Sequence, residues 1–327
     1  MPTIHYAGQG FGVQPGESVL DCLLRNGIAI SHSCKAGACQ SCLVKGSGGP
    51  IPEAAQRSLR DTLRVQGYFL ACSCRPSADI DVSPVGNEQR IGARISGLES
   101  LNETVLRVRL RTDAPLDYHA GQYVSLFRDD GLARSYSLAS LPDEEELELH
   151  VRRIPGGAMS GWLHREALPD TPVRLQGPAG NCFYASANPE EPLLLAGAGT
   201  GLAPLYGIVR DALQHGHRGP IWLFHGALTP EGLYLTRELR ELERANFNFH
   251  CVRSVLRDGD SSEVQDATIE TGELDRCILA RFPSLAGWKG YVCGDPALVN
   301  ALRKKLFLAG MASKAIYADA FLPSATG

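Results

Sequence analysis

Residues 34–42 have the sequence Cys-Lys-Ala-Gly-Ala-Cys-Gln-Ser-Cys, and Cys72 follows Cys42 after 29 intervening residues. A C-x4-C-x2-C triplet with one distant cysteine is the spacing of plant-type [2Fe-2S] sites. Structural zinc sites, the main alternative, usually combine two C-x2-C-like pairs instead. The spacing therefore predicts a cluster whose two bridged irons are held by four thiolates, those of Cys34, Cys39, Cys42 and Cys72.

Small side chains surround the predicted ligands. Gly37 and Ala38 suit a tight wrap of the chain and let backbone amides approach the cluster sulfurs, where hydrogen bonds help to set the reduction potential. Cys74, two residues after Cys72, is an alternative fourth ligand, although the spacing favours Cys72. Four further cysteines are expected to be ordinary buried thiols: Cys22, Cys182, Cys251 and Cys277.

The composition is that of a globular protein without a membrane segment. Of the 327 residues 44% are hydrophobic and 21% are charged, and no apolar run approaches the roughly 20 residues that span a bilayer. Residues 1–10 have neither the basic start nor the apolar stretch of a secretory signal, so we expect a cytoplasmic protein with reduced cysteines. A net charge of -4 argues against a nucleic-acid partner bound by phosphate neutralisation.

The hydrophobic pattern changes twice along the chain, which predicts three domains. Residues 1–88 form a small β-rich unit that contains a helix capped by Ser18. Residues 89–188 are short alternating strands punctuated by glycine and proline, which indicates an antiparallel β-barrel. Residues 189–327 alternate apolar runs with helical segments, which indicates a parallel sheet. The linker between the first two domains is expected at 81–90.

The barrel segment contains an R-x-Y-S motif at 134–137 that suits a flavin dinucleotide. Arg134 can neutralise the pyrophosphate, Tyr136 can lie against the isoalloxazine or ribityl chain, and Ser137 can hydrogen-bond near the flavin N5 atom. On its own the motif is weak, because arginine and tyrosine often alternate on ordinary strands. Two residues of a following strand are candidates for the same cofactor, His150 and Val151.

A glycine-serine segment after that strand strengthens the flavin hypothesis. Gly156-Gly157-Ala158-Met159-Ser160 precedes a helix that we expect to start near Gly161, with Ser160 as its cap. The free amides and the dipole of a helix start attract phosphate. Gly157 and Ser160 are therefore predicted to contact the second phosphate of FAD.

Residues 197–204, Gly-Ala-Gly-Thr-Gly-Leu-Ala-Pro, lead from a buried-strand run into a helix and predict a second anion site. The loop departs from the G-x-G-x-x-G fingerprint, because Leu202 replaces the third glycine. Cys293, alone an ordinary packed cysteine, ends another strand before Gly-Asp-Pro, and ligands of open α/β sheets gather at such ends. The candidates for nicotinamide-nucleotide binding are Gly199, Thr200, Gly201, Pro204, Cys293 and Gly294.

The segment 226–231, after the second strand of the third domain, predicts which nicotinamide nucleotide is used. The 2′-phosphate of NADPH needs a basic pocket near such a segment. Because the segment contains neither arginine nor lysine, the sequence favours NADH.

With these motifs in one order, the chain resembles the reductase components of bacterial ring-hydroxylating dioxygenases and related monooxygenases over essentially its whole length. The likeness to naphthalene-dioxygenase-type reductases lies in residues 133–137, 197–204, 285–288 and 316–321. It implies a multidomain α+β and α/β protein: a β-grasp ferredoxin domain, a flavin-binding barrel and a parallel-sheet nucleotide domain. Deoxysugar reductases of the CDP-glucoseen type share much of this pattern.

The resemblance also implies roles near the chain end. Phe321 would shield the flavin where nicotinamide enters, and Cys293 and Asp319 would lie near the hydride path together with Ser137. Two features depart from the family: Gln40 stands where glycine is common, and six residues follow Phe321. Neither departure removes a predicted ligand.

The expected activity is hydride transfer from NADH to FAD, followed by single-electron transfer through the [2Fe-2S] cluster. Flavin is needed between the two because hydride carries two electrons and the cluster accepts one. The acceptor is expected to be an oxygenase component or an intermediate ferredoxin; the alternatives are a deoxysugar dehydratase and a non-catalytic redox-sensing module. Residues 1–90 contain eight basic and seven acidic side chains, so no single-sign patch marks a docking surface, and we expect a monomer that contacts its acceptor transiently.

Overall fold

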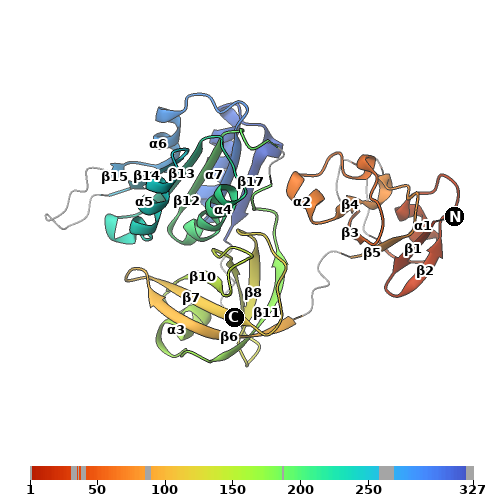
Figure 1. The fold of residues 1–327 in the computed structure, drawn as a ribbon, viewed down its shortest axis with the longest axis horizontal. Coiled ribbons are helices and arrows are strands. Elements are labelled where there is room, and N and C mark those ends of the chain that lie inside the picture. The colour runs from red at the N-terminus through yellow and green to blue at the C-terminus, as the bar shows by residue number, and fades with distance from the viewer. Residues whose placement is uncertain are drawn as a thin grey trace. The chain divides into compact units, whose positions relative to one another are not determined.

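The computed structural model describes residues 2–30, 35, 37, 42–84, 90–185, 188–257 and 269–321. The chain divides into two compact units, Met1–Glu88 and Gln89–Gly327 (Figure 1). Among the described residues, no helix combines the length and the apolar character that crossing a membrane requires.

The first unit is a mixed sheet packed against a short helix. Its strand order is β2-β1-β5-β3-β4, with β1 and β5 parallel at the centre. The Ser18 hydroxyl accepts a hydrogen bond from the Asp21 amide at 3.1 Å, which confirms the predicted cap of α1. The elements are β1 (Thr3–Tyr6), β2 (Gln9–Gly12), α1 (Val19–Arg25), β3 (Leu43–Ser47), α2 (Asp61–Val65), β4 (Tyr68–Leu70) and β5 (Ile80–Ser83).

The second unit begins with an antiparallel sheet that curls into a barrel, as the alternating pattern predicts. The strand order is β10-β7-β6-β11-β8-β9, and inward-facing aliphatic side chains such as Ile95 and Leu149 are fully buried. The elements are β6 (Arg90–Ser100), β7 (Val105–Thr112), β8 (Tyr123–Phe127), β9 (Ala133–Ser137), β10 (Leu147–Arg152), α3 (Ala158–Arg165) and β11 (Pro172–Ala179).

The rest of the second unit is a parallel sheet covered by helices on both faces. The strand order is β15-β14-β13-β12-β16-β17. From β12 the chain adds β13, β14 and β15 on one side and then returns to add β16 and β17 on the other, so the strand order reverses between β12 and β16. In open α/β sheets, ligands bind at the carboxyl ends of the strands beside such a point. The elements are β12 (Leu193–Ala198), α4 (Leu202–Gln214), β13 (Ile221–Ala227), α5 (Thr236–Ala245), β14 (Phe249–Val255), β15 (Ile269–Thr271), α6 (Leu274–Arg281), β16 (Lys289–Gly294), α7 (Pro296–Leu308) and β17 (Ile316–Ala320).

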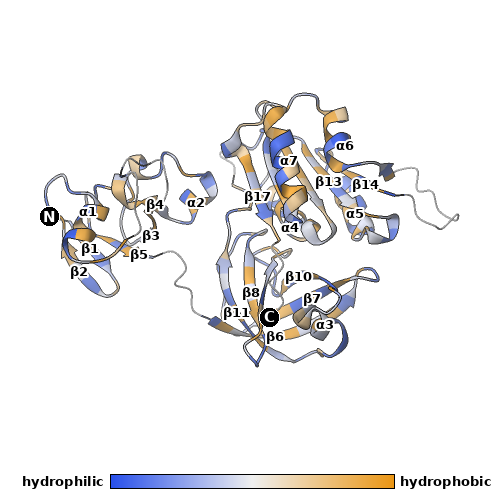
Figure 2. Ribbon diagram, turned by 180° about the vertical axis from the view of Figure 1, so that it is seen from behind, coloured by the Kyte–Doolittle hydropathy of each residue, from blue (hydrophilic) through white to orange (hydrophobic). Residues whose placement is uncertain are grey.

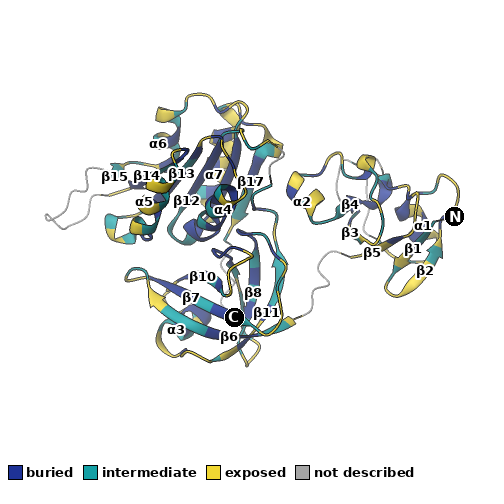
Figure 3. Cartoon of the chain, in the orientation of Figure 1, coloured by how far each residue is buried: buried dark blue, intermediate teal, exposed yellow. Residues whose placement is uncertain are grey.

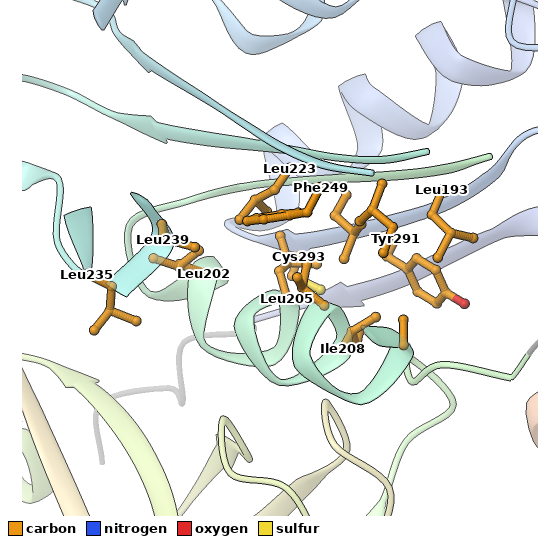
Figure 4. Packing of buried hydrophobic residues seen from close by; sticks show 14 of the residues in the cluster. Leu193, Leu202, Leu205, Ile208, Leu223, Leu235, Leu239, Phe249, Tyr291 and Cys293 are labelled. Carbon is orange, nitrogen blue, oxygen red and sulfur yellow. The ribbon is translucent and has the colours of Figure 1, made fainter. Parts of the chain in front are cut away.

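Alternate residues of the central strands divide between the two faces of this sheet. Leu193 and Leu195 pack with α4 and α5, whereas Leu194 and Ala196 pack with α6 and α7. The strands are accordingly apolar on both faces and buried (Figures 2 and 3). Figure 4 shows the hydrophobic cluster on the α4 and α5 side of the sheet, in which side chains of α4 reach the sheet beside Cys293.

The barrel and the parallel sheet share part of this cluster. Val105 of β7 and Cys182, which follows β11, are buried in the same apolar core as the α4 face of the sheet. Their packing explains why the flavin-type motif and the nucleotide-type motif belong to one compact unit.

Two predicted boundaries differ from the structure. The linker expected at 81–90 is partly strand, because β5 extends to Ser83 and β6 starts at Arg90; residues 85–89 lie outside the described part. The helix expected near Gly161 starts three residues earlier, at Ala158, because Gly157 adopts the extended N-cap conformation.

Candidate active site

Strands β9 and β10 carry the flavin motif on two neighbouring edges of the barrel. β9 pairs with β8 and β10 pairs with β7, and in the described structure a single bridge, Leu138 to Leu149, joins the two edges. We call this boundary the β9–β10 seam (Ala133–Ser137 and Leu147–Arg152). The unpaired backbone along the seam can bind a flat polar ligand, and five sequence-predicted residues lie on it: Arg134, Tyr136, Ser137, His150 and Val151.

Arg134 has the features of a phosphate-binding residue. Its Nη1 atom donates a hydrogen bond to the Ala133 carbonyl at 2.7 Å, and it has no carboxylate partner among the residues that the structure describes. A guanidinium that is not committed to an acidic side chain can pair with a diphosphate. Burial raises the pKa of Tyr136, so its phenol stays neutral and can pack against an aromatic ring.

The His150 side chain is committed to a buried network. Its Nε2 atom lies 2.8 Å from Glu148 Oε1, and its Nδ1 atom lies 3.1 Å from the Tyr234 hydroxyl. Arg107 contacts Glu148 at 3.1 Å and Glu238 of α5 at 3.6 Å. The network connects the barrel to the domain of the parallel sheet. Because the His150 side chain is used in this network, only the His150 backbone is available to bind a ligand in the seam.

The start of α3 lacks a side-chain cap. Gly157 occupies the N-cap position, and a Cβ atom there would lie 2.6 Å from Ser160 Oγ and 2.9 Å from Ile154 Cβ. Ser160 is not the cap that the sequence predicts, because its hydroxyl lies inside the first turn and accepts a hydrogen bond from the Ile154 amide at 3.1 Å. The uncapped amides of α3 therefore fit a phosphate group.

A hydrogen bond from the R-x-Y-S motif also joins the barrel to the nucleotide sheet. The Ser137 hydroxyl donates to Asp319 Oδ2 of β17 at 3.2 Å. Burial raises the pKa of Asp319, and the hydrogen bond from Ser137 opposes that change. Phe321 is held beside them, because its amide donates to the Gly294 carbonyl at 2.8 Å.

The 3-10 turn Gly199–Gly201 lies against the end of β16. A Cβ atom on Gly201 would overlap the Cys293 carbonyl group, and one on Gly197 would come within 2.7 Å of the same oxygen. Gly201 then caps α4 without a side-chain hydrogen bond, and Pro204 is buried in the first turn of the helix. Gly199 has a left-handed φ of 54° with open space around its Cβ position, and Thr200 is half-buried, so a phosphate can approach the turn.

Cys293 is fully buried at the carboxyl end of β16. Its sulfur lies 3.6 Å from the sulfur of Cys182, which follows β11 of the barrel. Burial and the Cys182 contact raise the pKa of Cys293, so the thiol is neutral. Cys182 was expected to be an ordinary buried thiol, and only the folded chain shows that it touches the predicted site residue.

Half of the predicted cluster ligands lie in the described structure. Cys42 and Cys72 are buried in the core of the first unit and their thiols interact, whereas Cys74 has no such contact with Cys42 and is fully buried. Gly37 has a φ of 73°, and a Cβ atom there would lie 2.7 Å from Ser73 Oγ, so Gly37 lies close to the residue that follows Cys72. This close approach fits a cluster held by Cys42 and Cys72. Cys34 and Cys39 lie outside the described residues, within which no group of three metal-binding side chains is found.

Family models match all three regions of the chain. A 2Fe-2S iron-sulfur cluster binding domain matches residues 3–77, an oxidoreductase FAD-binding domain matches 94–184, and an oxidoreductase NAD-binding domain matches 195–304. The reductase component of the naphthalene 1,2-dioxygenase system of Pseudomonas putida is 35% identical over 94% of both chains. The chain belongs to the family of iron-sulfur flavoprotein reductases.

Further relatives of this reductase agree. The reductase subunit of an aromatic O-demethylase from Amycolatopsis sp. is 33% identical over 98% of this chain and 99% of its own. A crystal structure of a cytochrome P450 reductase from Amycolatopsis covers 99% of both chains at 30% identity, with a TM-score of 0.69. The protein is thus an oxidoreductase that uses FAD, a nicotinamide nucleotide and a [2Fe-2S] cluster to transfer electrons to a partner, and the predicted cofactors and fold class are confirmed.

Proposed function

We propose that this reductase oxidises NADH at the meeting of the β9–β10 seam with the parallel sheet and delivers single electrons to an oxygenase component or an intermediate ferredoxin. The observation that carries the proposal is the 3.2 Å hydrogen bond from Ser137 to Asp319. It brings the end of the flavin motif to the carboxyl end of the sheet that carries the nicotinamide-type motif. Donor and acceptor rings bound to the two motifs would therefore meet there.

We assign the FAD contacts to the seam and to α3. Arg134 would bind the diphosphate, Tyr136 would pack against the flavin and Ser137 would hydrogen-bond near N5. The backbone of two β10 residues and the start of α3 would complete the site, through His150, Val151, Gly157 and Ser160. The absence of a carboxylate partner for Arg134 in the described structure and the uncapped helix support this assignment.

We assign the nicotinamide nucleotide to the opposite side of the Ser137–Asp319 contact. The turn and first helical residues would hold its diphosphate, through Gly199, Thr200, Gly201 and Pro204. Cys293, Gly294 and Phe321 would surround the nicotinamide, with Phe321 covering the flavin until nicotinamide displaces it. Asp319 would hold Ser137 in position and, when ionised, favour the positive charge of the oxidised nicotinamide.

The cluster is the proposed exit for electrons, since it supplies one-electron chemistry when bound to Cys34, Cys39, Cys42 and Cys72. The supporting observations are the burial of Cys42 and Cys72 and the close approach of Gly37 to Ser73. We propose domain limits of 1–88, 89–188 and 189–327. The division into two compact units supports the first boundary, and the separate sheets of the second unit support the other.

NADH is the proposed electron donor because the segment Gly226–Glu231 contains no basic side chain and one acidic residue, Glu231. A ratio of kcat/KM for NADH to that for NADPH well above one would support this choice. Equal or reversed ratios would refute it.

The acceptor follows from what the relatives are named for. They include reductase components of naphthalene 1,2-dioxygenase, terephthalate 1,2-dioxygenase and phenol 2-monooxygenase systems. We infer that this reductase transfers electrons to an oxygenase of aromatic catabolism. We also propose that it is a monomer. Transfer from the NADH-reduced protein to purified oxygenase components, followed by stopped-flow absorbance, tests the inference, and absence of transfer to all of them would refute it.

Cys42→Ser tests the proposed electron path. The variant should lose cytochrome c reduction, which needs the cluster, and keep NADH-dependent ferricyanide reduction, which the flavin supports directly. Equal loss of both activities would contradict the path. Cys72→Ser and Cys74→Ser provide the matched comparison: visible and electron paramagnetic resonance spectra should show loss of the cluster only in Cys72→Ser.

A further inference from the structure

His225 is a fully buried polar side chain whose position calls for a partner. It lies in β13 and has no solvent exposure. Neither of its ring nitrogens makes a hydrogen bond within the part of the chain that the structure describes. A buried polar group without a partner is unfavourable, so its retention needs an explanation.

The register of the sheet places His225 in one row with the proposed nicotinamide site. Parallel pairing aligns Asp319 with Cys293, Cys293 with Gly197, Gly197 with His225 and His225 with Arg253. Side chains at paired positions of adjacent parallel strands point to the same face of a sheet. His225 therefore lies on the α4 side, next to the strand that leads into the turn Gly199–Gly201.

The neighbours of the imidazole fix its orientation and its charge. The Tyr234 ring lies 5.4 Å away in an edge-to-face arrangement. Burial, and then the nearby Arg253, lower the pKa of His225 to about 3, so the ring is neutral and offers one N–H donor. The Gly199 backbone acts in the opposite direction, and β13 contacts the turn Gly199–Gly201, but neither ring nitrogen of His225 makes a hydrogen bond within the described residues.

A turn that binds a phosphate must direct its backbone amides and its carbonyl oxygens to opposite sides. Its amides have to point at the anion, so its carbonyl oxygens have to point away, toward the protein interior. An inward carbonyl needs a buried donor, or the carbonyl is left unsatisfied. His225 is a buried neutral donor paired with Gly197, two residues before the turn, and β13 contacts the turn itself, so the donor lies on the side where such a group is required.

We propose that His225 is a positioning residue for dinucleotide binding: its ring N–H bonds the Gly199 carbonyl when the turn closes on the diphosphate, and thereby holds the amides of Gly199–Gly201 toward the ligand. The inference rests on the proposed function, since it requires a nicotinamide dinucleotide at this turn. His225 touches no reacting atom and acts through Gly199. It should therefore govern affinity for the diphosphate portion and leave hydride transfer unchanged.

The test measures binding of ADP-ribose, which contains the diphosphate but no nicotinamide, to the FAD-loaded protein by isothermal titration calorimetry. His225→Phe keeps a buried ring and removes the donor, and we expect about tenfold weaker ADP-ribose binding, the effect of one lost hydrogen bond. The KM for NADH should rise by a similar factor, while kcat at saturating NADH changes less than about twofold. His225→Asn and His225→Gln restore a donor near the Nδ1 and Nε2 positions, and one of them should recover most of the affinity.

His217→Phe is the matched control. His217 is also buried, but it precedes β13 and therefore lies at the amino end of the sheet, with its Nδ1 atom 3.2 Å from the Tyr184 hydroxyl. It should alter thermal stability and leave ADP-ribose affinity within about twofold of the wild type, since the diphosphate turn is at the other end.

The possible outcomes distinguish failure of the His225 positioning role from failure of the proposed dinucleotide site. Unchanged ADP-ribose affinity in His225→Phe would overturn the positioning role while the dinucleotide site stands. Wild-type protein that binds neither ADP-ribose nor NADH would refute the dinucleotide site and the inference together. Should His225→Phe fail to fold, equal tenfold weakening in the Asn and Gln variants would overturn the role of the donor, and recovery in one of them would support it.

Discussion

The starts of α3 and α4 are both uncapped and glycine-rich, yet the glycines are required for different reasons. At α3, a Cβ atom on Gly157 would meet mainly side-chain atoms, those of Ser160 and Ile154. At α4, a Cβ atom on Gly201 would overlap the backbone of Cys293. A side chain can move by rotation about its bonds, whereas a strand inside a sheet cannot, so the α4 turn is the more rigid of the two.

The proposed FAD and nucleotide sites, to which these helix starts belong, also differ in charge. The flavin motif supplies Arg134, which has no carboxylate partner in the described structure, whereas residues 197–204 contain no basic side chain. Attraction between a guanidinium and a phosphate weakens only gradually when the two groups are displaced. Binding of a phosphate by backbone amides in a closely fitting turn depends more strongly on their exact positions. The difference suits a flavin that stays bound and a nucleotide that must leave after each turnover, and the following predictions test it from the largest expected effect to the smallest.

Gly201→Ala should produce the largest loss. The added methyl group would push the turn away from β16, and a displacement of about 1 Å can cost on the order of 100-fold in a positioned reaction. We expect the KM for NADH in ferricyanide reduction to rise by about that factor, with FAD content unchanged. Gly216→Asn, at a left-handed residue with open space after α4, controls for glycine replacement and should leave the KM unaltered. A normal KM in Gly201→Ala would show that the turn is not rigid.

Arg134→Ala should weaken FAD binding by about 30-fold, the effect of losing hydrogen bonds to a charged group. Titration of apoprotein with FAD, followed by flavin fluorescence at low and high salt, measures it. Wild-type affinity should fall with salt and the variant should lose that dependence, because the paired charge is gone. Arg111→Ala, which removes an exposed ion pair with Glu146 from the same barrel, is the control. An unchanged salt dependence in Arg134→Ala would mean that charge does not distinguish the two proposed sites.

Asp319→Asn tests the link between the two sites. Because burial raises the pKa of Asp319, its carboxyl ionises above the ordinary range for aspartate, and hydride transfer should accelerate as pH rises through that titration. Stopped-flow flavin reduction should show this acidic limb in the wild type. The variant should lack it and react about tenfold more slowly above it, because the negative charge that favours the oxidised nicotinamide is absent.

Stability should change in the opposite direction to activity. Ionised Asp319 is disfavoured by the fold, so wild-type stability relative to Asp319→Asn should fall as pH rises from the ordinary aspartate value through the raised one. Asp211→Asn is the control, because burial also raises the pKa of Asp211, which lies in the second half of α4. It should change the pH dependence of stability and not that of flavin reduction; an acidic limb that persists in Asp319→Asn would assign the titration to another group.

Local signals in the sequence predict much of this architecture. The cap at Ser18 and the buried strand β12 before residues 197–204 each depend on a few adjacent residues, and both appear where expected. Residue type predicts the wrong start for α3, because Ser160 is a good cap residue by type but its hydroxyl accepts a hydrogen bond from the Ile154 amide instead. That competition is a matter of loop geometry, which residue type does not encode.

The missing parts of the candidate site depend on contacts between distant segments. Cys182 meets Cys293 across 111 residues, and His150 meets Tyr234 across 84. His225 looks like any residue of a buried strand until the register aligns it with Gly197. No periodicity in a single sequence reports such pairs, because they arise only when segments that are distant in the chain pack together.

Gly157→Ala should have the smallest effect, and it decides the comparison most directly. Its methyl group would lie 2.6 Å from Ser160 Oγ and 3.1 Å from the Ile154 carbonyl oxygen, and rotation of Ser160 can relieve the closer contact. We expect FAD affinity to fall by about threefold, the scale of an unfavourable N-cap replacement. Gly97→Ala in β6 controls for a methyl group added to the same barrel, since its nearest neighbour would be a side-chain atom at 3.8 Å. If Gly157→Ala instead loses FAD as severely as Gly201→Ala loses NADH, the start of α3 is as rigid as the turn before α4, and the two proposed sites differ in charge alone.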